Sequence, residues 1–153
     1  MAHFPVNHPL RPLYRALSGL AGIYLIIFGI VGLIVTSGDG LFGTAGHRVL
    51  GQGTNLFWSI VSLIIGAIVV VATVLGGNIL SETDKYIGWG LLVVGTFGLA
   101  VARTDANVLD FSITTVVVTY LVGLVLIMAG LYSKVALPQE AGAPRQVREG
   151  RPA

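Results

Sequence analysis

The chain has 153 residues, of which 54% are hydrophobic and only 10% are charged. Soluble domains carry about 25% charged residues, so this composition and a mean hydropathy of +0.86 predict an integral membrane protein. A net charge of +2, with the basic residues dispersed along the chain, argues against nucleic-acid binding. The absence of cysteine excludes disulfides, thiol catalysis and thiolate metal sites.

Four apolar runs without a charged residue follow one another along the chain. A helix rises about 1.5 Å per residue and the hydrocarbon core is about 30 Å thick, so runs of this length can span a bilayer. We therefore predict an all-α polytopic membrane protein with a four-helix transmembrane domain over residues 15–135. The expected spans are residues 17–35, 56–75, 86–102 and 111–132.

Two tails flank this domain. Residues 1–14 are polar, and Pro12 suits the first turn of a helix. Residues 136–153 mix Pro, Gly, Ala, Glu and Arg, which predicts a flexible tail. Arg11 and Arg15 precede the first apolar run as in a signal peptide, but that run exceeds a typical signal-peptide core and no clear A-x-A cleavage site follows it. We expect the first span to be retained.

Three loops connect the expected spans. The first, residues 37–54, is the longest and is rich in glycine; it can form a short interfacial helix or a dipping loop, which is not the favoured interpretation. Residues 76–85 and 103–110 form the other two loops. Polar residues before three spans can bond the free N–H groups of a first helical turn. These expected caps are Thr54-Asn55, Thr83-Asp84 and Asp110.

Lysine and arginine are distributed unevenly between the two sides that four spans imply. The side with both termini holds Arg11, Arg15, Lys85, Lys134, Arg145, Arg148 and Arg151. The other side holds only Arg48 and Arg103. Because cytoplasmic loops carry the excess of positive residues, this distribution predicts a multi-pass plasma-membrane protein with both termini in the cytoplasm.

The two halves of the chain share a pattern. Residues 22–35 align without gaps on residues 88–101, and the second and fourth spans follow Asn55 and Asn107. Two interpretations stay open: tandem helical hairpins related by a pseudo-twofold axis along the membrane normal, or two spans of similar composition. Small residues let helix backbones approach closely, so we expect spans one and three to pack tightly through their glycine faces. These glycines are Gly22, Gly29, Gly32, Gly88, Gly95 and Gly98.

Polar residues gather in the loops opposite the termini and form the strongest candidate for a binding site. They are Arg48, Thr54, Asn55, Trp58, Arg103, Asp105, Asn107 and Asp110. Such a cluster can bind a small polar ligand or a partner loop. The alternative, which we favour, is a set of helix caps and loop ion pairs, with Trp58 as an interfacial aromatic residue.

Hydroxyl groups within the expected spans are a second polar feature of the sequence. They belong to Ser59, Ser62, Ser112, Thr114, Thr115 and Thr119. They can line a small polar cavity, but bonds to their own helix backbone or to a neighbouring helix are the favoured interpretation.

No set of residues predicts catalysis, a cofactor site or a metal site. His3 and His8 lie in the N-terminal tail and His47 lies on the opposite side, so the histidines do not match zinc or iron ligand spacing. The sequence contains no P-loop, HExxH pattern or Ser-His-Asp set. We therefore expect a non-enzymatic protein without a cofactor.

Four segments together carry a resemblance to a known family. They are His8-Pro-Leu-Arg-Pro-Leu-Tyr-Arg15, Gly53-Thr-Asn-Leu56, Asp105-Ala-Asn-Val-Leu-Asp110 and Gly130-Leu-Tyr-Ser-Lys134. Over residues 7–135, the chain resembles a family of small four-span membrane proteins of unknown function that are found mainly in actinobacteria. The resemblance implies four spans and an inner-membrane location, and it brings no activity or site residues.

These observations predict a structural or accessory subunit of a membrane complex. Its expected partners are the lipid bilayer and either further copies of itself or a larger membrane complex, with no nucleic acid. The alternative is a small oligomeric channel or carrier for a neutral solute, lined by the polar second and fourth spans. An enzyme that acts on lipid through Asp105 or Asp110 is the least favoured hypothesis.

Overall fold

Four α-helices account for most of residues 6–137, the part of the chain that the computed structural model describes. The helices are α1 (Arg11–Val35), α2 (Leu56–Leu75), α3 (Gly77–Val101) and α4 (Ile113–Tyr132). Two short antiparallel strands, β1 (Arg48–Val49) and β2 (Gln52–Gly53), lie between α1 and α2. The predicted all-α class with four helices is confirmed. His3 and nearly all of the expected flexible tail, 136–153, lie outside the described residues.

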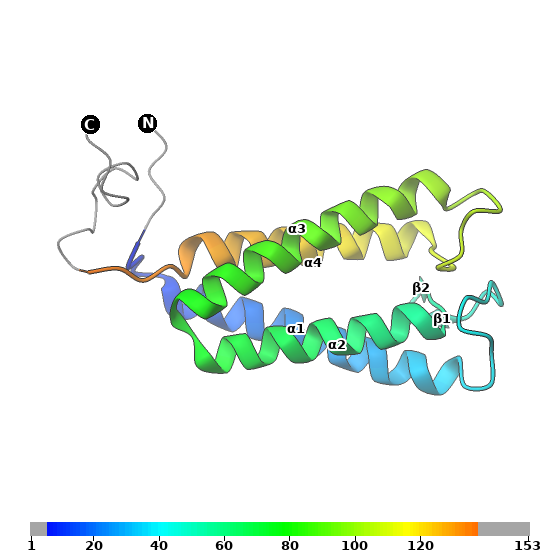
Figure 1. Ribbon diagram of the computed structural model, residues 1–153, viewed down its shortest axis with the longest axis horizontal. Helices are drawn as coiled ribbons and strands as arrows, with labels where there is room; N and C mark the ends of the chain where they lie inside the picture. Colours follow the sequence, from blue (N-terminus) through cyan, green and yellow to red (C-terminus); the bar gives the residue numbers. More distant parts are fainter. Residues whose placement is uncertain (1–5, 138–153) are drawn as a thin grey trace.

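The helices form two hairpins, α1–α2 and α3–α4, which lie side by side in an elongated bundle (Figure 1). The described chain begins and finishes at one end of the bundle, beside the α2–α3 connection. We call this the terminal end. The connections between α1 and α2 and between α3 and α4 lie at the opposite end, which we call the loop end.

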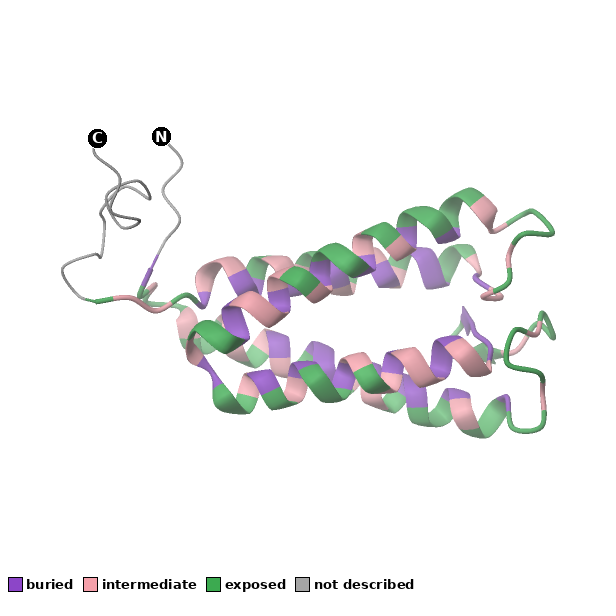
Figure 2. Ribbon diagram, viewed as in Figure 1, coloured by how far each residue is buried: buried purple, intermediate pink, exposed green. Residues whose placement is uncertain are grey.

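The bundle exposes apolar side chains and buries small and polar ones. Ile34 and Val74 are each 70% exposed, whereas Ser18 and Ser59 are fully buried. Figure 2 shows exposed residues along the outer surfaces of the helices. An apolar surface of this extent is unfavourable in water and suited to lipid. Since α1, α2 and α4 are also long and apolar enough to cross a bilayer, the structure indicates a membrane location.

The third helix begins earlier than the charge pattern predicts. Residues 77–85, expected as loop, form the first turns of α3, and the predicted cap Asp84 lies inside the helix. Gly76 alone joins α2 to α3, with φ 69° and ψ −161°, a conformation open to glycine and costly for other residues. The sequence prediction was wrong here because three charged residues close together were interpreted as a loop.

The starts of the other helices follow the predictions more closely. Pro12 lies in the first turn of α1, and Asn55 caps α2 by accepting a hydrogen bond from the backbone N–H of Trp58 at 2.9 Å. The predicted cap Asp110 is wrong, because α4 is capped by Ser112 in a reciprocal capping box with Thr115. The first loop contains the β1–β2 ribbon and no interfacial helix, and it dips toward the bundle interior, where Val49 and Gln52 are buried and Gln52 bonds Tyr24 of α1.

The glycine faces pack against the other helix of their own hairpin. Gly22 of α1 faces Gly66 of α2, where a Cβ on Gly66 would lie 2.7 Å from the Gly22 carbonyl oxygen. Gly88 of α3 faces Gly123 of α4, where a Cβ on Gly88 would lie 2.7 Å from the Gly123 carbonyl oxygen. Each hairpin therefore brings two backbones together at a crossing that only glycine allows.

The remaining glycines of these faces lie further along the same contacts. Gly29 and Gly32 lie against Leu63 and Ser59 of α2. A Cβ on Gly95 would lie 3.5 Å from the Tyr120 ring in α4, and Gly98 lies against the Phe111 ring. The glycines of α1 and α3 thus serve the two hairpins separately, and do not join α1 to α3.

Buried positions repeat between the two hairpins. The buried residues Ser18, Gly22 and Leu25 of α1 align with the buried residues Asp84, Gly88 and Leu91 of α3. In α2 and α4, the buried positions coincide when the two N-caps are aligned, so that Asn55 is equivalent to Ser112 and not to Asn107. The equivalent buried pairs are Ser62/Thr119, Gly66/Gly123, Val69/Leu126 and Ala72/Ala129.

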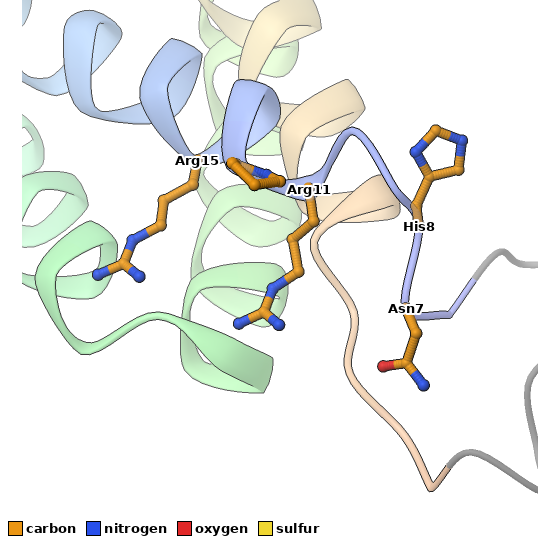
Figure 3. A pocket seen from close by; sticks show the side chains of 5 residues that line it. Asn7, His8, Arg11 and Arg15 are labelled. Carbon is orange, nitrogen blue, oxygen red and sulfur yellow. The ribbon is translucent and has the colours of Figure 1, made fainter.

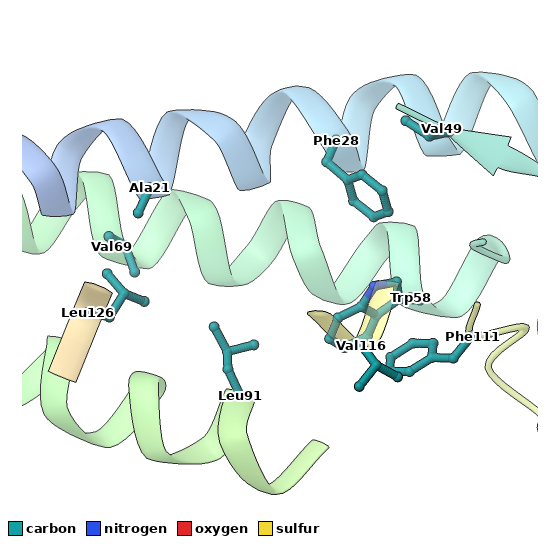
Figure 4. Packing of buried hydrophobic residues seen from close by; sticks show 9 residues of the cluster. All are labelled: Ala21, Phe28, Val49, Trp58, Val69, Leu91, Phe111, Val116 and Leu126. Carbon is teal, nitrogen blue, oxygen red and sulfur yellow. The ribbon is translucent and has the colours of Figure 1, made fainter. Parts of the chain in front are cut away.

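The apolar core lies between the hairpins and draws on all four helices. Figure 4 shows its buried side chains, which are Ala21, Phe28, Val49, Trp58, Val69, Leu91, Phe111, Val116 and Leu126. Trp58 of α2 meets Phe111, just before α4, edge to face with ring centroids 4.8 Å apart. This aromatic contact closes the core at the loop end, because each ring comes from a different hairpin.

Candidate functional site

One buried carboxyl group lies where three helices meet at the terminal end. Asp84 of α3 is fully buried, and its Oδ1 accepts a hydrogen bond from Ser18 Oγ of α1 at 3.0 Å. Ser18 Oγ also lies 3.1 Å from Thr73 Oγ1 of α2. Since Ser18 has one proton to donate, Thr73 is the donor in that second bond. We call Ser18, Thr73 and Asp84 the Asp84 network.

The second oxygen of this carboxyl group is unpaired. Asp84 Oδ2 is buried and has no hydrogen-bond partner within residues 6–137. A buried polar atom without a hydrogen-bond partner costs free energy, and this cost is larger for a charged group than for a neutral polar group. A buried ionisable side chain with an unpaired polar atom is often part of a functional site. Asp84 is therefore the main candidate for a functional side chain in the described chain.

Neighbouring basic side chains are engaged elsewhere. Lys85, the next residue of α3, pairs with Glu82 at 2.7 Å. Arg15 of α1 donates from Nε to the Thr73 carbonyl oxygen and from Nη2 to the Val74 carbonyl oxygen, both at 2.8 Å. Within residues 6–137 the Asp84 carboxyl group thus accepts one hydrogen bond, from the Ser18 hydroxyl group, and forms no ion pair.

Sequence reasoning missed Asp84 because it was assigned to a loop as a helix cap. One signal was available. When the alignment of Gly22 with Gly88 is extended by one helical turn toward the N-terminus, Ser18 aligns with Asp84. The structure shows that these two equivalent residues bond directly across the boundary between the hairpins. A polar residue at the same position in both repeats predicts such a contact if the repeat is taken as real.

The predicted polar cluster lies at the loop end, and three of its members bond to loop backbone. Asn55 Nδ2 donates to the Val108 carbonyl oxygen at 2.7 Å. Asp110 Oδ2 accepts from the Gly46 backbone N–H at 2.8 Å. Asn107 Oδ1 accepts from the Phe111 backbone N–H at 2.9 Å. Asn55 and Asp110 therefore connect the first loop to the third.

The other members of the cluster do not join these contacts. Arg48, Arg103 and Asp105 are exposed. Within residues 6–137 the ion pairs are His47–Asp39, at 2.6 Å, and Lys85–Glu82, so the loop ion pairs expected among the residues of this cluster do not form. Thr54 is buried and its Oγ1 lies 3.1 Å from Ser59 Oγ. The cluster is split into buried or half-buried residues that form hydrogen bonds and an exposed charged set.

Most span hydroxyls bond to backbone atoms. Ser59 Oγ donates to the Asn55 carbonyl oxygen and Thr119 Oγ1 to the Thr115 carbonyl oxygen, both at 2.8 Å. Thr115 Oγ1 donates to the Gly53 carbonyl oxygen of β2 at 2.8 Å, which holds the ribbon against α4. Ser62 differs, because its Oγ is buried and has no partner within the described residues.

Ser62 lines a small internal cavity toward the loop end. Its walls include Tyr24, Gln52 and Thr119, and the Gln52 amide donates to the Tyr24 hydroxyl group. The cavity has a volume of about 10 Å³, which is the space for about one water molecule. In this conformation this cavity therefore holds no solute larger than water.

Residues 6–137 contain no group of three His, Asp or Glu side chains that could hold a metal ion. The chain matches no protein-family model, and neither a curated protein nor a solved structure is significantly similar to it. The resemblance to small actinobacterial four-span proteins therefore stays a prediction. What the chain does must be inferred from its own geometry.

Proposed function

We propose that this protein is a non-enzymatic integral membrane protein that serves as a structural or accessory subunit and associates with further copies of itself. The observation that carries the proposal is an unpartnered apolar face of α3. Ile79, Tyr86, Val93 and Phe97 are 56%, 76%, 68% and 48% exposed, and the exposed Gly90 lies among them. Residues 86, 90, 93 and 97 follow one another in steps of four, three and four, a spacing typical of a helix–helix seam.

Gly90 supports close helix approach at the middle of this face. A Cβ at Gly90 would meet no atom within 4 Å, so this glycine is not required by packing within the described chain. An apolar groove of about 330 Å³ continues the face toward α2 and includes Ala67, Ile79 and Thr83. Small residues beside larger apolar ones suit the packing of a second helix in lipid. A twofold contact between two copies of α3 uses the same surface on both.

Gly90→Leu is expected to shift the protein toward the monomer, because the larger side chain separates the two helices where they approach most closely. Native mass analysis after gentle detergent extraction measures the oligomeric state. We expect an oligomer for the unmodified chain and a loss of about tenfold in association constant for the variant, which corresponds to about 1.4 kcal/mol.

Ala16→Leu is the matched control, since Ala16 is an exposed small residue on a different helix, α1. It is expected to leave the oligomeric state unchanged. Recovery of the unmodified protein only as a monomer without a partner would contradict the proposal. An equal effect of both leucine variants would contradict the assignment of the α3 face.

We further propose that α3 is a fourth membrane span and that both termini are cytoplasmic. The support is that α3 runs antiparallel to α4 over the length of the bundle (Figure 1) and that the terminal end carries Arg11, Arg15, Lys85 and Lys134. A reporter that is active only in the cytoplasm should be active when fused after Leu137 and inactive when inserted within residues 40–46. The reverse pattern would overturn the orientation.

The alternative function, a channel or carrier for a neutral solute, has less support. The internal cavity is the observation in its favour, because Ser62 and Thr119 contribute polar groups to it from α2 and α4. Its volume of about 10 Å³ requires the helices to separate before any solute enters. Thr115, expected to line a path, bonds to the β2 backbone.

A further inference from the structure

A cavity of about 300 Å³ opens at the terminal end, and its lining is basic and polar. It is lined by Asn7, His8, Arg11, Pro12 and Arg15, which come from the start of α1 and the segment before it. Figure 3 shows the two guanidinium groups extending in the same direction from α1, while the His8 ring points away from them. The two arginines therefore form the positively charged wall of this cavity.

Contacts with other segments hold the cavity in place. Arg15 is fixed by its bonds to the last carbonyl groups of α2. Asn7 Nδ2 donates to the Ala136 carbonyl oxygen at 2.8 Å, and Asn7 Oδ1 accepts from the Ala136 backbone N–H at 3.2 Å. The His8 ring packs edge-on against Tyr132 with centroids 5.1 Å apart. The segment that lines the cavity is thus held by contacts with residues near the other end of the described chain.

The positive charge of this cavity is not neutralised by the described chain. Neither Arg11 nor Arg15 forms an ion pair within residues 6–137, and Arg11 has no side-chain hydrogen bond there, although it is partly buried. Guanidinium groups bind phosphate oxygens with two parallel hydrogen bonds, and within the described residues the donors of Arg11 are free for that geometry, while Arg15, held on the α2 carbonyl groups, adds its positive charge. We propose that the Arg11–Arg15 cavity binds a phosphate group.

The source of this phosphate group is a phospholipid headgroup or a free phosphate ion. The cavity lies where the apolar helix α1 begins, and Leu10 and Leu13 beside it are 50% and 52% exposed. Exposed apolar side chains next to convergent arginines match a molecule with an anionic head and acyl chains. These side chains favour the headgroup, and the experiment separates the two sources.

The test uses the full-length protein in detergent. Native mass analysis compares retention of phosphatidylglycerol and phosphatidylcholine with identical acyl chains, and thermal unfolding is followed with added inorganic phosphate. We expect preferential retention of phosphatidylglycerol, reduced about fivefold by Arg11→Gln, since one basic residue near an anionic lipid contributes about 1 kcal/mol. Arg11 is the residue to change because Arg15 also joins α1 to α2.

Lys134→Gln is the matched control, because Lys134 is exposed, carries the same charge and lies at the same end of the bundle, where its carbonyl oxygen accepts from the Asn7 backbone N–H. It is expected to leave phosphatidylglycerol retention unchanged. Stabilisation by inorganic phosphate that depends on Arg11, without a preference for phosphatidylglycerol, would support the phosphate site and identify the free ion as its ligand. The proposal is overturned if neither measurement depends on Arg11, or if Lys134→Gln reduces retention equally.

Discussion

Gly88→Ala is expected to lower the free energy of unfolding by about 1–3 kcal/mol. The added Cβ would lie 2.7 Å from the Gly123 carbonyl oxygen and 2.9 Å from the Ile127 backbone nitrogen. Because these are backbone atoms, α3 and α4 must separate to admit the methyl group, and contacts along the hairpin weaken. Denaturant or thermal unfolding in detergent, followed by circular dichroism, measures the change.

Gly95→Ala is the matched control on the same helix, two turns further along. Its Cβ would lie 3.5 Å from the Tyr120 ring, an ordinary contact distance, and alanine favours the helix over glycine by up to about 1 kcal/mol. We therefore expect this variant to be as stable as the unmodified protein or slightly more stable. Equal destabilisation by both substitutions would show that the α3–α4 crossing is not as close as the structure describes.

Ser18→Ala is expected to destabilise the protein by about 1–3 kcal/mol, which is large for the loss of one hydroxyl group. The reason is Asp84, whose Oδ1 loses its Ser18 donor while its Oδ2 already lacks a partner within residues 6–137. A carboxyl group without any partner then remains buried among three helices. Unfolding in detergent again provides the measurement.

Two further variants separate this effect from the mere loss of a buried serine. Ser62→Ala removes an equally buried hydroxyl group that has no partner within the described residues, so it should change stability by less than about 0.5 kcal/mol. In an Asp84→Ala background, Ser18→Ala should cost less than about 1 kcal/mol, since no carboxyl group is left unpaired. Additive effects of Ser18→Ala and Asp84→Ala would contradict the proposed coupling.

The stability of Asp84→Ala itself bears on function. If this variant is at least as stable as the unmodified chain, the carboxyl group is not retained for folding. Residues that cost stability are characteristic of functional sites. The Asp84 network is then the leading candidate for a functional site within the bundle, separate from the proposed phosphate site at Arg11.

The helices that the sequence predicted well are those with the longest uninterrupted apolar runs. α2 matches its predicted bounds, and the cap Asn55 was recognised because a polar side chain directly precedes an apolar run. α3 was predicted too short because Glu82, Asp84 and Lys85 interrupt the hydropathy. Hydropathy measures affinity for lipid and not helicity, so the hydropathy pattern does not reveal the part of a helix that contains charged residues.

The candidate site could be predicted only in part. The loop-end cluster was located from its composition, but its division into buried and exposed residues depends on how the first and third loops cross. Asn55 bonds to Val108 and Asp110 bonds to Gly46, and both bonds join residues that are far apart in the sequence. No local pattern encodes such pairs, because either side chain can equally bond to water or to its own loop.

The sequence by itself determined the helical class, the apolar surface and the existence of two glycine faces, because these depend on local composition and on the backbone hydrogen bonds within each helix. Only the tertiary structure decided which helix each glycine face meets, and that Ser18 of one hairpin bonds Asp84 of the other. The physical reason is that lipid is as apolar as the helix surfaces, so burial does not select partners. Close backbone contact and the pairing of a few polar atoms select them.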